Sequence, residues 1–374
     1  MAPNFPKEKT LGKVLVIGGC GFLGHHIVNL LLTSSTSQVS VLDVTTTRNR
    51  RPDSDGVAYY DGNITSLPSL LSIFAQAKPD VVIHTASPNL MGANNELYYK
   101  VNVEGTKCVV AACQQTGVKA LVYTSSASVV SDTMHDLVNA DERWPVIPAS
   151  AQLEYYSTTK AEAEALVLAA NRSPAHPDFL TCSLRPAGIF GEGDVQLLPN
   201  IINVHHTNRT GFQLGSNENL FDFTYVLNVA HAHVLASCAL LQTSQLPTAP
   251  LDYERVDGEA FFITNDEPVY FWDFARAVWK AAGSENGTEH VWVIGRDVGM
   301  FIGGVLEWGM WMLGRTPKLT RKQVRYSTMT RYYDCSKAKR RLGYRPLVGL
   351  QQGITRSVAF FAEQKSDGGR KKGQ

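Results

Sequence analysis

A tyrosine and a lysine at helical spacing are the residues that first suggest chemistry. The stretch EYYSTTK at 154–160 places Tyr156 four residues before Lys160, whereas Tyr155 has Thr159 at that spacing. The Ala- and Glu-rich sequence that follows favours a helix, on which side chains four residues apart share one face. A nearby ammonium stabilises a phenolate, so the pair could make Tyr156 a general base. The same spacing occurs by chance on many surface helices, so the rest of the chain has to decide.

A glycine-rich turn, GGCGFLG, separates an apolar run from a helical pattern. In this context Gly18 permits a tight turn, Gly21 lets a pyrophosphate approach the backbone, and Gly24 allows close packing of the helix on the sheet. The start of the helix supplies N–H donors to the anion. A turn without a ligand is the weaker alternative. The whole turn is therefore predicted to bind the cofactor: Gly18, Gly19, Cys20, Gly21, Phe22, Leu23 and Gly24.

Asp43 ends the next apolar run, 19 residues after Gly24. At that position a carboxylate accepts hydrogen bonds from the adenosine ribose hydroxyls and repels a 2′-phosphate, which favours NAD over NADP. Arg48, Arg50 and Arg51 follow closely and could accept such a phosphate. We therefore expect NAD as the cofactor, with NADP as the alternative.

The elements that must position these residues alternate along the first half of the chain. Short apolar runs predict strands at 14–18, 39–43, 56–64, 80–86, 119–126 and 181–186. The segments between them predict helices at 22–32, 67–77, about 96–115 and around Tyr156. Unbroken apolar strands separated by helices indicate an α/β fold with a doubly wound parallel sheet of the Rossmann type. Beyond about 190 the pattern loosens, and we expect a helix at 223–241 and a strand at 259–264.

Length and composition limit the possible classes of protein. The chain has 374 residues, 44% of them hydrophobic, which allows one large core with a smaller substrate region. A net charge of +1 gives no reason to expect nucleic acid as a partner. The polar N-terminus lacks a signal-peptide core, so we expect the cytosolic side. The predicted organisation is a tail at 1–12, a dinucleotide-binding domain at 13–190, a substrate-binding region at 191–362 and a disordered basic tail at 363–374.

Several motifs occur in an order that resembles one enzyme family. After the glycine turn come DGNIT (61–65), HTAS (84–87), VNVEGT (101–106), YTSSASV (123–129), YSTTK (156–160) and RPAGIFGEGD (185–194). Over residues 13–360 the chain resembles the extended short-chain dehydrogenase/reductases, and within them the 3β-hydroxysteroid dehydrogenase group. In that group it is most similar to the fungal members that decarboxylate 4α-carboxysterols in ergosterol synthesis.

The resemblance implies roles for individual residues. Tyr156 would be the general base, with its pKa lowered from about 10 by Lys160 and the oxidised nicotinamide. Ser126 would bind the substrate oxygen together with Tyr156, and Ser125 or, less favoured, Thr124 could replace it. Further cofactor contacts are implied for Asp61, Gly62, His84, Thr85, Ala86, Pro186, Ala187, Gly188 and Ile189. Asn102 would be a structural link to a strand and not a participant in the chemistry. Ser87, where many relatives carry alanine, would matter little to cofactor binding, because the backbone makes the contact there.

The implied activity is NAD(P)-dependent oxidation of the 3β-hydroxyl of a 4α-carboxysterol to the 3-ketone with loss of CO₂. The alternatives are a 3β-hydroxysteroid dehydrogenase without decarboxylation, a nucleotide-sugar epimerase or dehydratase, and a cofactor-binding regulator without catalysis. A sugar-nucleotide site should carry arginines for a diphosphate, and the stretch 212–226 has none. Ser126, Tyr156 and Lys160 argue against a regulator. No histidine has companion ligands at a convincing spacing, so no metal site is expected.

An apolar stretch, GMFIGGVLEWGMWMLG at 299–314, is shorter than the roughly 20 residues that span a bilayer. At helical spacing it places four apolar side chains on one stripe, Phe301, Val305, Trp308 and Met312, and five basic residues follow: Arg315, Lys318, Arg321, Lys322 and Arg325. This pattern indicates either a helix lying in a membrane interface or a helix that roofs an apolar pocket. The resemblance implies the cytosolic face of the endoplasmic-reticulum membrane, with other enzymes of sterol C4 demethylation as partners.

Overall fold

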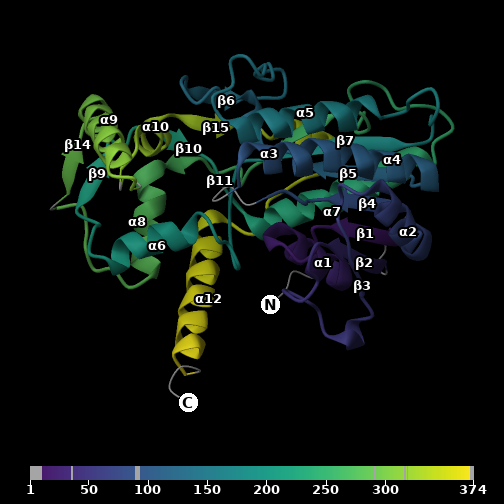
Figure 1. The fold of residues 1–374 in the computed structure, drawn as a ribbon, viewed down its shortest axis with the longest axis horizontal. Coiled ribbons are helices and arrows are strands. Elements are labelled where there is room, and N and C mark those ends of the chain that lie inside the picture. Colours follow the sequence, from purple (N-terminus) through teal and green to yellow (C-terminus); the bar gives the residue numbers. More distant parts are fainter. Residues whose placement is uncertain are drawn as a thin grey trace.

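The computed structural model describes residues 11–34, 37–88, 93–289, 291–315, 317 and 319–370. Its centre is a seven-stranded sheet in the order β12-β7-β5-β4-β1-β2-β3, and every neighbouring pair is parallel (Figure 1). The strands are β1 (Lys13–Ile17), β2 (Gln38–Asp43), β3 (Ala58–Asp61), β4 (Val81–His84), β5 (Ala120–Thr124), β7 (Leu180–Pro186) and β12 (Ala260–Ile263).

Alternate residues of these strands face two separate apolar cores. Val14 and Val16 pack with helices α1 (Phe22–Ser34) and α7 (Val226–Ser244) on one face. Leu15 and Ile17 pack on the other face with α2 (Leu67–Ala77), α4 (Thr106–Thr116) and α5 (Tyr155–Ala169). Because the central strands are covered on both sides, their sequences are continuously apolar. The prediction of a doubly wound parallel sheet is confirmed.

Helix α7 is the one helix of the described residues that is long and apolar enough to cross a membrane. Most of its apolar part is buried, and it packs along α1 and the sheet. Its apolar character is that of a core helix.

The predicted helix at 96–115 is three successive segments. They are α3 (Asn95–Tyr98), the π-helical segment η2 (Tyr99–Gly105) and α4. A π-helical turn inserts extra backbone into a helix and often accompanies functional sites. In this protein the π-helical segment carries the buried Asn102.

The prediction of a helix at 223–241 was wrong for its first three residues. Phe223–Tyr225 form β11, which pairs in parallel with β8 (Gly188–Phe190), and α7 begins only at Val226. The aromatic and β-branched side chains of β11 are fully buried, and this burial outweighs the helical periodicity of the segment. The predicted strand at 259–264 is β12, which extends the main sheet beside β7.

The remaining strands form smaller sheets outside the main one, and all of them except β6 lie in the region predicted to bind the substrate. A four-stranded sheet has the order β13-β10-β15-β6, and a two-stranded sheet joins β14 to β9. Their bounds are β6 (Leu137–Ala140), β9 (Phe212–Leu214), β10 (Leu220–Phe221), β13 (Val269–Tyr270), β14 (Trp292–Ile294) and β15 (Arg331–Tyr333). The helices are α6 (Leu198–His206), α8 (Phe271–Ala281), α9 (Arg296–Met312), α10 (Arg321–Thr328) and α11 (Ser336–Arg341). In Figure 1 α9 lies at the end of the molecule opposite α2 and α4.

The two predicted tails differ from the structure where it describes them. Helix α12 (Leu350–Arg370) projects from the body and continues through Arg370, whereas a disordered tail was predicted from 363 (Figure 1). Residues 371–374 lie outside the described residues. Of the tail predicted at 1–12, only Leu11 and Gly12 are described, and Leu11 is buried in the core.

Candidate active site

Helix α5 carries the tyrosine–lysine pair to the carboxyl end of β5. Tyr155 points outward and is exposed, whereas Tyr156 is half-buried and Lys160 is only 2% exposed. The Lys160 ammonium donates a hydrogen bond to the Thr124 carbonyl, the last residue of β5, and lies 4.4 Å from the centre of the Tyr123 ring. The buried lysine therefore fixes α5 against the end of β5. Ser126 lies two residues beyond this end.

Burial lowers the pKa of Lys160 to about 7, because a desolvated ammonium favours its neutral form. Glu164, one turn further along α5, acts in the opposite direction and favours the charged ammonium. Glu164 is itself buried and accepts hydrogen bonds from Arg185, at 3.0 Å from Nε, and from the Ser183 hydroxyl at 2.9 Å. Arg185 and Ser183 thus hold in place the Glu164 carboxylate that favours the charged form of Lys160.

The phenol of Tyr156 lies in the neighbourhood of the Ser87 and Ser126 hydroxyls, which act on its pKa. The ring of Tyr98 meets it edge-on, with centroids 5.7 Å apart. Burial, together with Tyr98, raises the pKa of Tyr156 to about 12, while the two serine hydroxyls lower it. The protein alone therefore keeps this phenol neutral near pH 7. The hydrogen bond described for the Lys160 ammonium is to Thr124, so its predicted effect on the phenol stays a prediction.

A chain of serines orients the Ser126 hydroxyl. Its Oγ accepts hydrogen bonds from the backbone N–H and the hydroxyl of Ser128, at 3.2 and 2.9 Å. The Ser128 hydroxyl in turn accepts from Ser157 at 2.8 Å. The hydrogen of Ser126 is therefore left for the phenol or for a substrate oxygen. Sequence reasoning assigned no role to Ser128 and Ser157, although each lies within a motif that it had identified.

The two alternative hydroxyls are less suited to this role. Ser125 Oγ is buried and has no hydrogen-bond partner among the described residues. The Thr124 hydroxyl is bonded to His233 Nε2 at 2.7 Å, inside the core. The geometry favours Ser126 over both.

The glycine turn is closely packed at Gly18 and Gly24 and open to solvent at Gly21. Gly18 has φ +82°, a left-handed conformation that glycine adopts without strain, and a Cβ at Gly24 would lie 2.1 Å from the Gly18 carbonyl oxygen. Gly21 is exposed, and only that carbonyl lies within 4 Å of its Cβ position. The buried Cys20 and Leu23 hold the turn against the core. This cradle at the start of α1 fits a pyrophosphate.

Asp43 ends β2 beside this turn, as predicted. Its carboxylate accepts hydrogen bonds from the backbone N–H groups of Cys20 and Val44, at 3.0 and 2.8 Å. A carboxylate has about four acceptor sites, so it can still accept from a ribose. Asp61, at the end of β3, accepts from the Thr46 N–H at 2.9 Å, and Gly62 N–H donates to the Asp43 carbonyl. These contacts hold the adenosine side of the crevice.

Two of the three nearby arginines are paired with acids. Arg50 contacts Asp53 at 3.3 Å, and Arg51 contacts Asp55 at 2.7 Å. Arg48 is exposed. These ion pairs partly offset the positive charge beside Asp43.

The other predicted cofactor residues lie at the same edge of the sheet. The Thr85 hydroxyl donates to the Ile17 carbonyl at 2.9 Å, and the Ala86 backbone packs against Gly18. His84 is fully buried, where its ring bonds to Thr106 and desolvation lowers its pKa to about 3, so it is a neutral structural residue. The segment that continues from β7 into β8 supplies Pro186, Ala187, Gly188 and Ile189.

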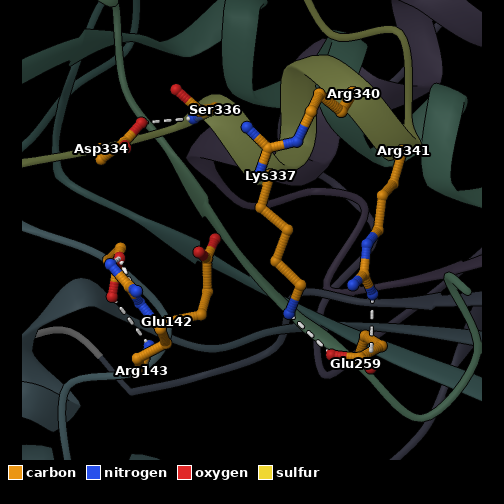
Figure 2. Close-up of a pocket in the computed structure, with 9 residues that line it drawn as sticks. Glu142, Arg143, Glu259, Asp334, Ser336, Lys337, Arg340 and Arg341 are labelled. Atoms are coloured by element: carbon orange, nitrogen blue, oxygen red, sulfur yellow. Dashed lines mark hydrogen bonds and ion pairs between the residues drawn. The ribbon is translucent and has the colours of Figure 1, made fainter. Parts of the chain in front are cut away.

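Charged side chains line a cavity of about 580 Å³ that is separate from this site (Figure 2). Lys337 donates to Glu259 at 2.6 Å and to the Ala260 carbonyl at 2.8 Å, while Glu142 accepts from the Phe262 N–H at 2.8 Å. Both backbone groups belong to the outer edge of β12, which has no neighbouring strand there. The lining therefore covers a sheet edge that would otherwise be open to pairing.

No group of three or more His, Cys, Asp and Glu residues that could hold a metal occurs in the part of the chain that the structure describes. The functional groups at the site are hydroxyls, a phenol and an ammonium.

The model of the 3-beta hydroxysteroid dehydrogenase/isomerase family matches residues 15–294. The chain belongs to this family. Among curated members, the decarboxylating sterol-4-alpha-carboxylate 3-dehydrogenase of Saccharomyces cerevisiae is 41% identical over 94% of this chain and 99% of its own length. The human enzyme of the same name is 36% identical over 92% of this chain and 87% of its own length.

Solved structures share the fold of this family member at low identity. A UDP-glucose 4-epimerase of Thermus thermophilus in complex with NAD is 23% identical with a TM-score of 0.66, over 93% of this chain and 98% of the other. A dTDP-glucose 4,6-dehydratase of Bacillus anthracis, also with NAD, is 18% identical with a TM-score of 0.68, over 94% and 97%. Their likeness supports the extended Rossmann architecture.

Replacing Ser126 with alanine should lower kcat by about 10²-fold, the scale of losing one donor to a reacting oxygen. Cofactor affinity should stay unchanged. Ser125→Ala is the matched comparison, since it removes a neighbouring buried hydroxyl without a described partner, and it should leave kcat within about twofold. Steady-state kinetics and thermal melting of both variants provide the measurement. A larger loss in Ser125→Ala than in Ser126→Ala would contradict the assignment.

Proposed function

We propose that this protein oxidises the 3β-hydroxyl of a 4α-carboxysterol to the 3-ketone with NAD, and that the carboxylate leaves as CO₂. The observation that carries the proposal is the meeting of Ser126, Tyr156 and Lys160 beside a dinucleotide cradle. The substrate is taken from the yeast relative, named as a decarboxylating sterol-4-alpha-carboxylate 3-dehydrogenase, which matches nearly the whole chain.

The cofactor residues follow from the cradle and the motifs. The turn 18–24 would hold the pyrophosphate and Asp43 the adenosine ribose, with Asp61 and Gly62 near the adenine. Lys160 would hold the nicotinamide ribose, and the segment 186–189 would line the nicotinamide. When bound, the oxidised nicotinamide supplies the acceptor for the hydride from C3.

The chain's own groups handle the substrate proton. Ser126 donates its hydrogen to the substrate oxygen and aligns the C3–H bond. Tyr156, as phenolate, takes the proton of the hydroxyl while the C3 hydride leaves, which gives the ketone. The positive charges of Lys160 and of the oxidised cofactor offset the burial that raises the pKa of this phenol to about 12.

Decarboxylation needs no further catalytic residue. The new ketone stands β to the carboxylate, so the electron pair of the breaking carbon–carboxyl bond moves into an enolate as CO₂ departs. Protonation of the enolate at C4 completes the 4-decarboxylated 3-ketosteroid. We identify no sequence motif dedicated to this step.

Incubation with NAD and a 4α-carboxysterol labelled at the carboxylate should release reduced cofactor, labelled CO₂ and 3-ketosteroid in equal amounts. Reduced cofactor without labelled CO₂ would indicate a hydroxysteroid dehydrogenase that does not decarboxylate. Turnover of UDP-sugars and none of sterols would favour the epimerase alternative.

Tyr156→Phe should lower kcat by at least about 10² with cofactor binding nearly unchanged, because it removes the general base.

Asp43→Ala should erode the preference for NAD, because the carboxylate that excludes a 2′-phosphate is lost. The measurement is kcat/KM with NAD and with NADP for both proteins. Arg48→Ala is the comparison variant and should leave the preference for NAD intact. A wild-type enzyme that already prefers NADP would mean that the arginines outweigh Asp43.

We also propose that α9 docks on the cytosolic face of the endoplasmic-reticulum membrane, where the sterol and other enzymes of C4 demethylation would be met. Phe301, Trp308 and Trp311 of this helix are 73%, 66% and 77% exposed. In the adjoining ribbon Trp292 pairs with Phe212, and both are exposed. So large an exposed apolar face supports membrane contact over a pocket roof.

The charges beside this face suit an interface. Glu307, the one acid within 299–314, pairs with Arg321 at 2.7 Å, which neutralises it. Arg315 is exposed at the end of the helix, while Lys318 lies outside the described residues. Cations at that edge would face anionic headgroups.

Replacing Phe301, Trp308 and Trp311 together with serine should release the protein from endoplasmic-reticulum membranes into the soluble fraction, since most of the buried apolar area is lost. Sedimentation and flotation of membranes measure this. The matched control replaces Leu246, Leu251 and Tyr253, which are also exposed but lie elsewhere, and it should stay bound. Wild-type protein in the soluble fraction would favour the pocket-roof alternative.

A further inference from the structure

Arg331, the first residue of β15, is a half-buried cation without an acid as partner. Its Nε donates to the Tyr333 hydroxyl at 2.7 Å, and within the described residues its side chain has no other hydrogen bond and no ion pair. The charge of Glu154 acts on Arg331, but the Glu154 carboxylate pairs with Lys322 at 2.8 Å. The two terminal nitrogens of the guanidinium therefore still have hydrogens to donate.

A short chain of contacts links Arg331 to the residue that follows Ser126. The Tyr333 hydroxyl, which accepts from Arg331, donates to the Ala127 carbonyl at 3.3 Å. Tyr333 also packs with Ala127 and Ala187 in one buried cluster. Ala187 belongs to the segment that would line the nicotinamide. The guanidinium therefore lies close to the loop that presents the Ser126 hydroxyl.

The strand register places Arg331 beside an aromatic wall. Phe221 of β10 is its partner in the parallel pair, so the two side chains leave the sheet on the same face. A Cβ built on Gly188 would lie 3.7 Å from the Tyr326 hydroxyl and 3.9 Å from the Phe221 ring. The Phe221 and Tyr326 rings have their centroids 5.0 Å apart. This wall borders the proposed nicotinamide site, so Arg331 adjoins that site as well as the Ser126 loop.

We propose that Arg331 binds the 4α-carboxylate of the sterol and so selects acidic sterols over neutral ones. The inference rests on the proposed function, because it assigns a partner to the carboxyl group of that substrate. The carboxylate on C4 and the reacting hydroxyl on C3 are neighbours on the sterol ring. A substrate whose hydroxyl is held by Ser126 therefore has its carboxylate in the neighbourhood of the guanidinium.

Both charges are stabilised by this pairing. A carboxylate that enters an apolar sterol pocket loses its hydration, which is costly unless a cation and hydrogen bonds replace the water. A half-buried guanidinium without an acid partner has the same deficit. Arginine presents parallel N–H donors to the two oxygens of a carboxylate, so it fixes the orientation of the group as well as its charge. Because Tyr333 holds Nε, the guanidinium is oriented before the substrate binds.

The pairing also distinguishes the substrate from the product. As the bond between C4 and the carboxyl carbon breaks, the negative charge passes to the enolate oxygen at C3, which Ser126 holds in the proposed mechanism. Protonation of the enolate then leaves a neutral 3-ketosteroid. This product has no charge-assisted contact with Arg331, so it should bind more weakly than the substrate.

The test compares the 4α-carboxysterol with the same sterol lacking the carboxyl group, because both carry the 3β-hydroxyl and both reduce NAD when oxidised. Arg331→Gln should lower kcat/KM for the 4α-carboxysterol by about 10²-fold, the scale of truncating one partner of a desolvated charge pair. It should leave kcat/KM for the neutral sterol within about twofold. Equilibrium binding of the two sterols to the enzyme with reduced cofactor gives the same comparison without turnover.

Two further variants serve as comparisons. Arg331→Lys keeps the charge but not the planar guanidinium, so its loss on the 4α-carboxysterol should fall between wild type and Arg331→Gln. The matched control is Arg143→Gln, which removes an exposed arginine at the separate charged cavity and should leave both sterols unaffected. Thermal melting shows whether each variant is folded. Should Arg331→Gln fail to fold, Arg331→Met, which is uncharged and of similar length, takes its place in the same comparison.

The outcomes separate this inference from the proposed function. An equal loss on both sterols would mean that Arg331 only supports the fold, and no loss on either would mean that it does not meet the substrate. Each of these results would overturn the inference. Oxidation of the 4α-carboxysterol without release of CO₂ would overturn the decarboxylation and leave the role of Arg331 intact. A wild type that turns over UDP-sugars and no sterol would overturn the proposed function and assign the guanidinium to a diphosphate.

Discussion

The active site depends on one buried contact, the hydrogen bond from the Lys160 ammonium to the Thr124 carbonyl at the end of β5. An ammonium that is 2% exposed needs strong compensation for its lost hydration, and the carbonyl, the Tyr123 ring and the Glu164 carboxylate provide it. This contact places the first turn of α5 over the end of the central strand. Ser126 follows β5 by two residues and Tyr156 precedes Lys160 by one turn, so the contact brings hydroxyl and phenol together.

The sheet topology places the glycine turn beside these residues. The chain runs from β1 outward to β2 and β3 and then returns to β4 on the other side of β1. The reversal opens a crevice at the carboxyl ends of β1 and β4, where ligands of doubly wound sheets bind. The glycine turn follows β1, Thr85 and Ser87 follow β4, and Ser126 follows the adjacent β5. Tyr156, Ser126 and the glycine turn therefore lie at one edge of the sheet.

The outer edge of β12 and the surface formed by α9 and β14 differ in how they meet solvent. The outer edge of β12 is sealed by Lys337 and Glu142, whose charges leave little that another chain could pair with (Figure 2). The flank formed by α9 and β14 keeps Phe301, Trp311 and Trp292 in solvent. The proposed docking of α9 on a membrane would cover this exposed apolar area.

The sequence by itself determined the elements of the main sheet, the glycine turn with Asp43, and the placement of Tyr156 and Lys160 one turn apart on a helix, because each depends on periodicity or spacing within a short segment. It could not place Phe223–Tyr225 in a strand, since burial against β8 overrides the local pattern. Nor could it show the hydrogen bond from Ser87 to Asn102, which lies 15 positions later in the sequence. Only the tertiary structure decided these points, because strand pairing and hydrogen bonds between distant segments exist only once the fold has brought their donors and acceptors together.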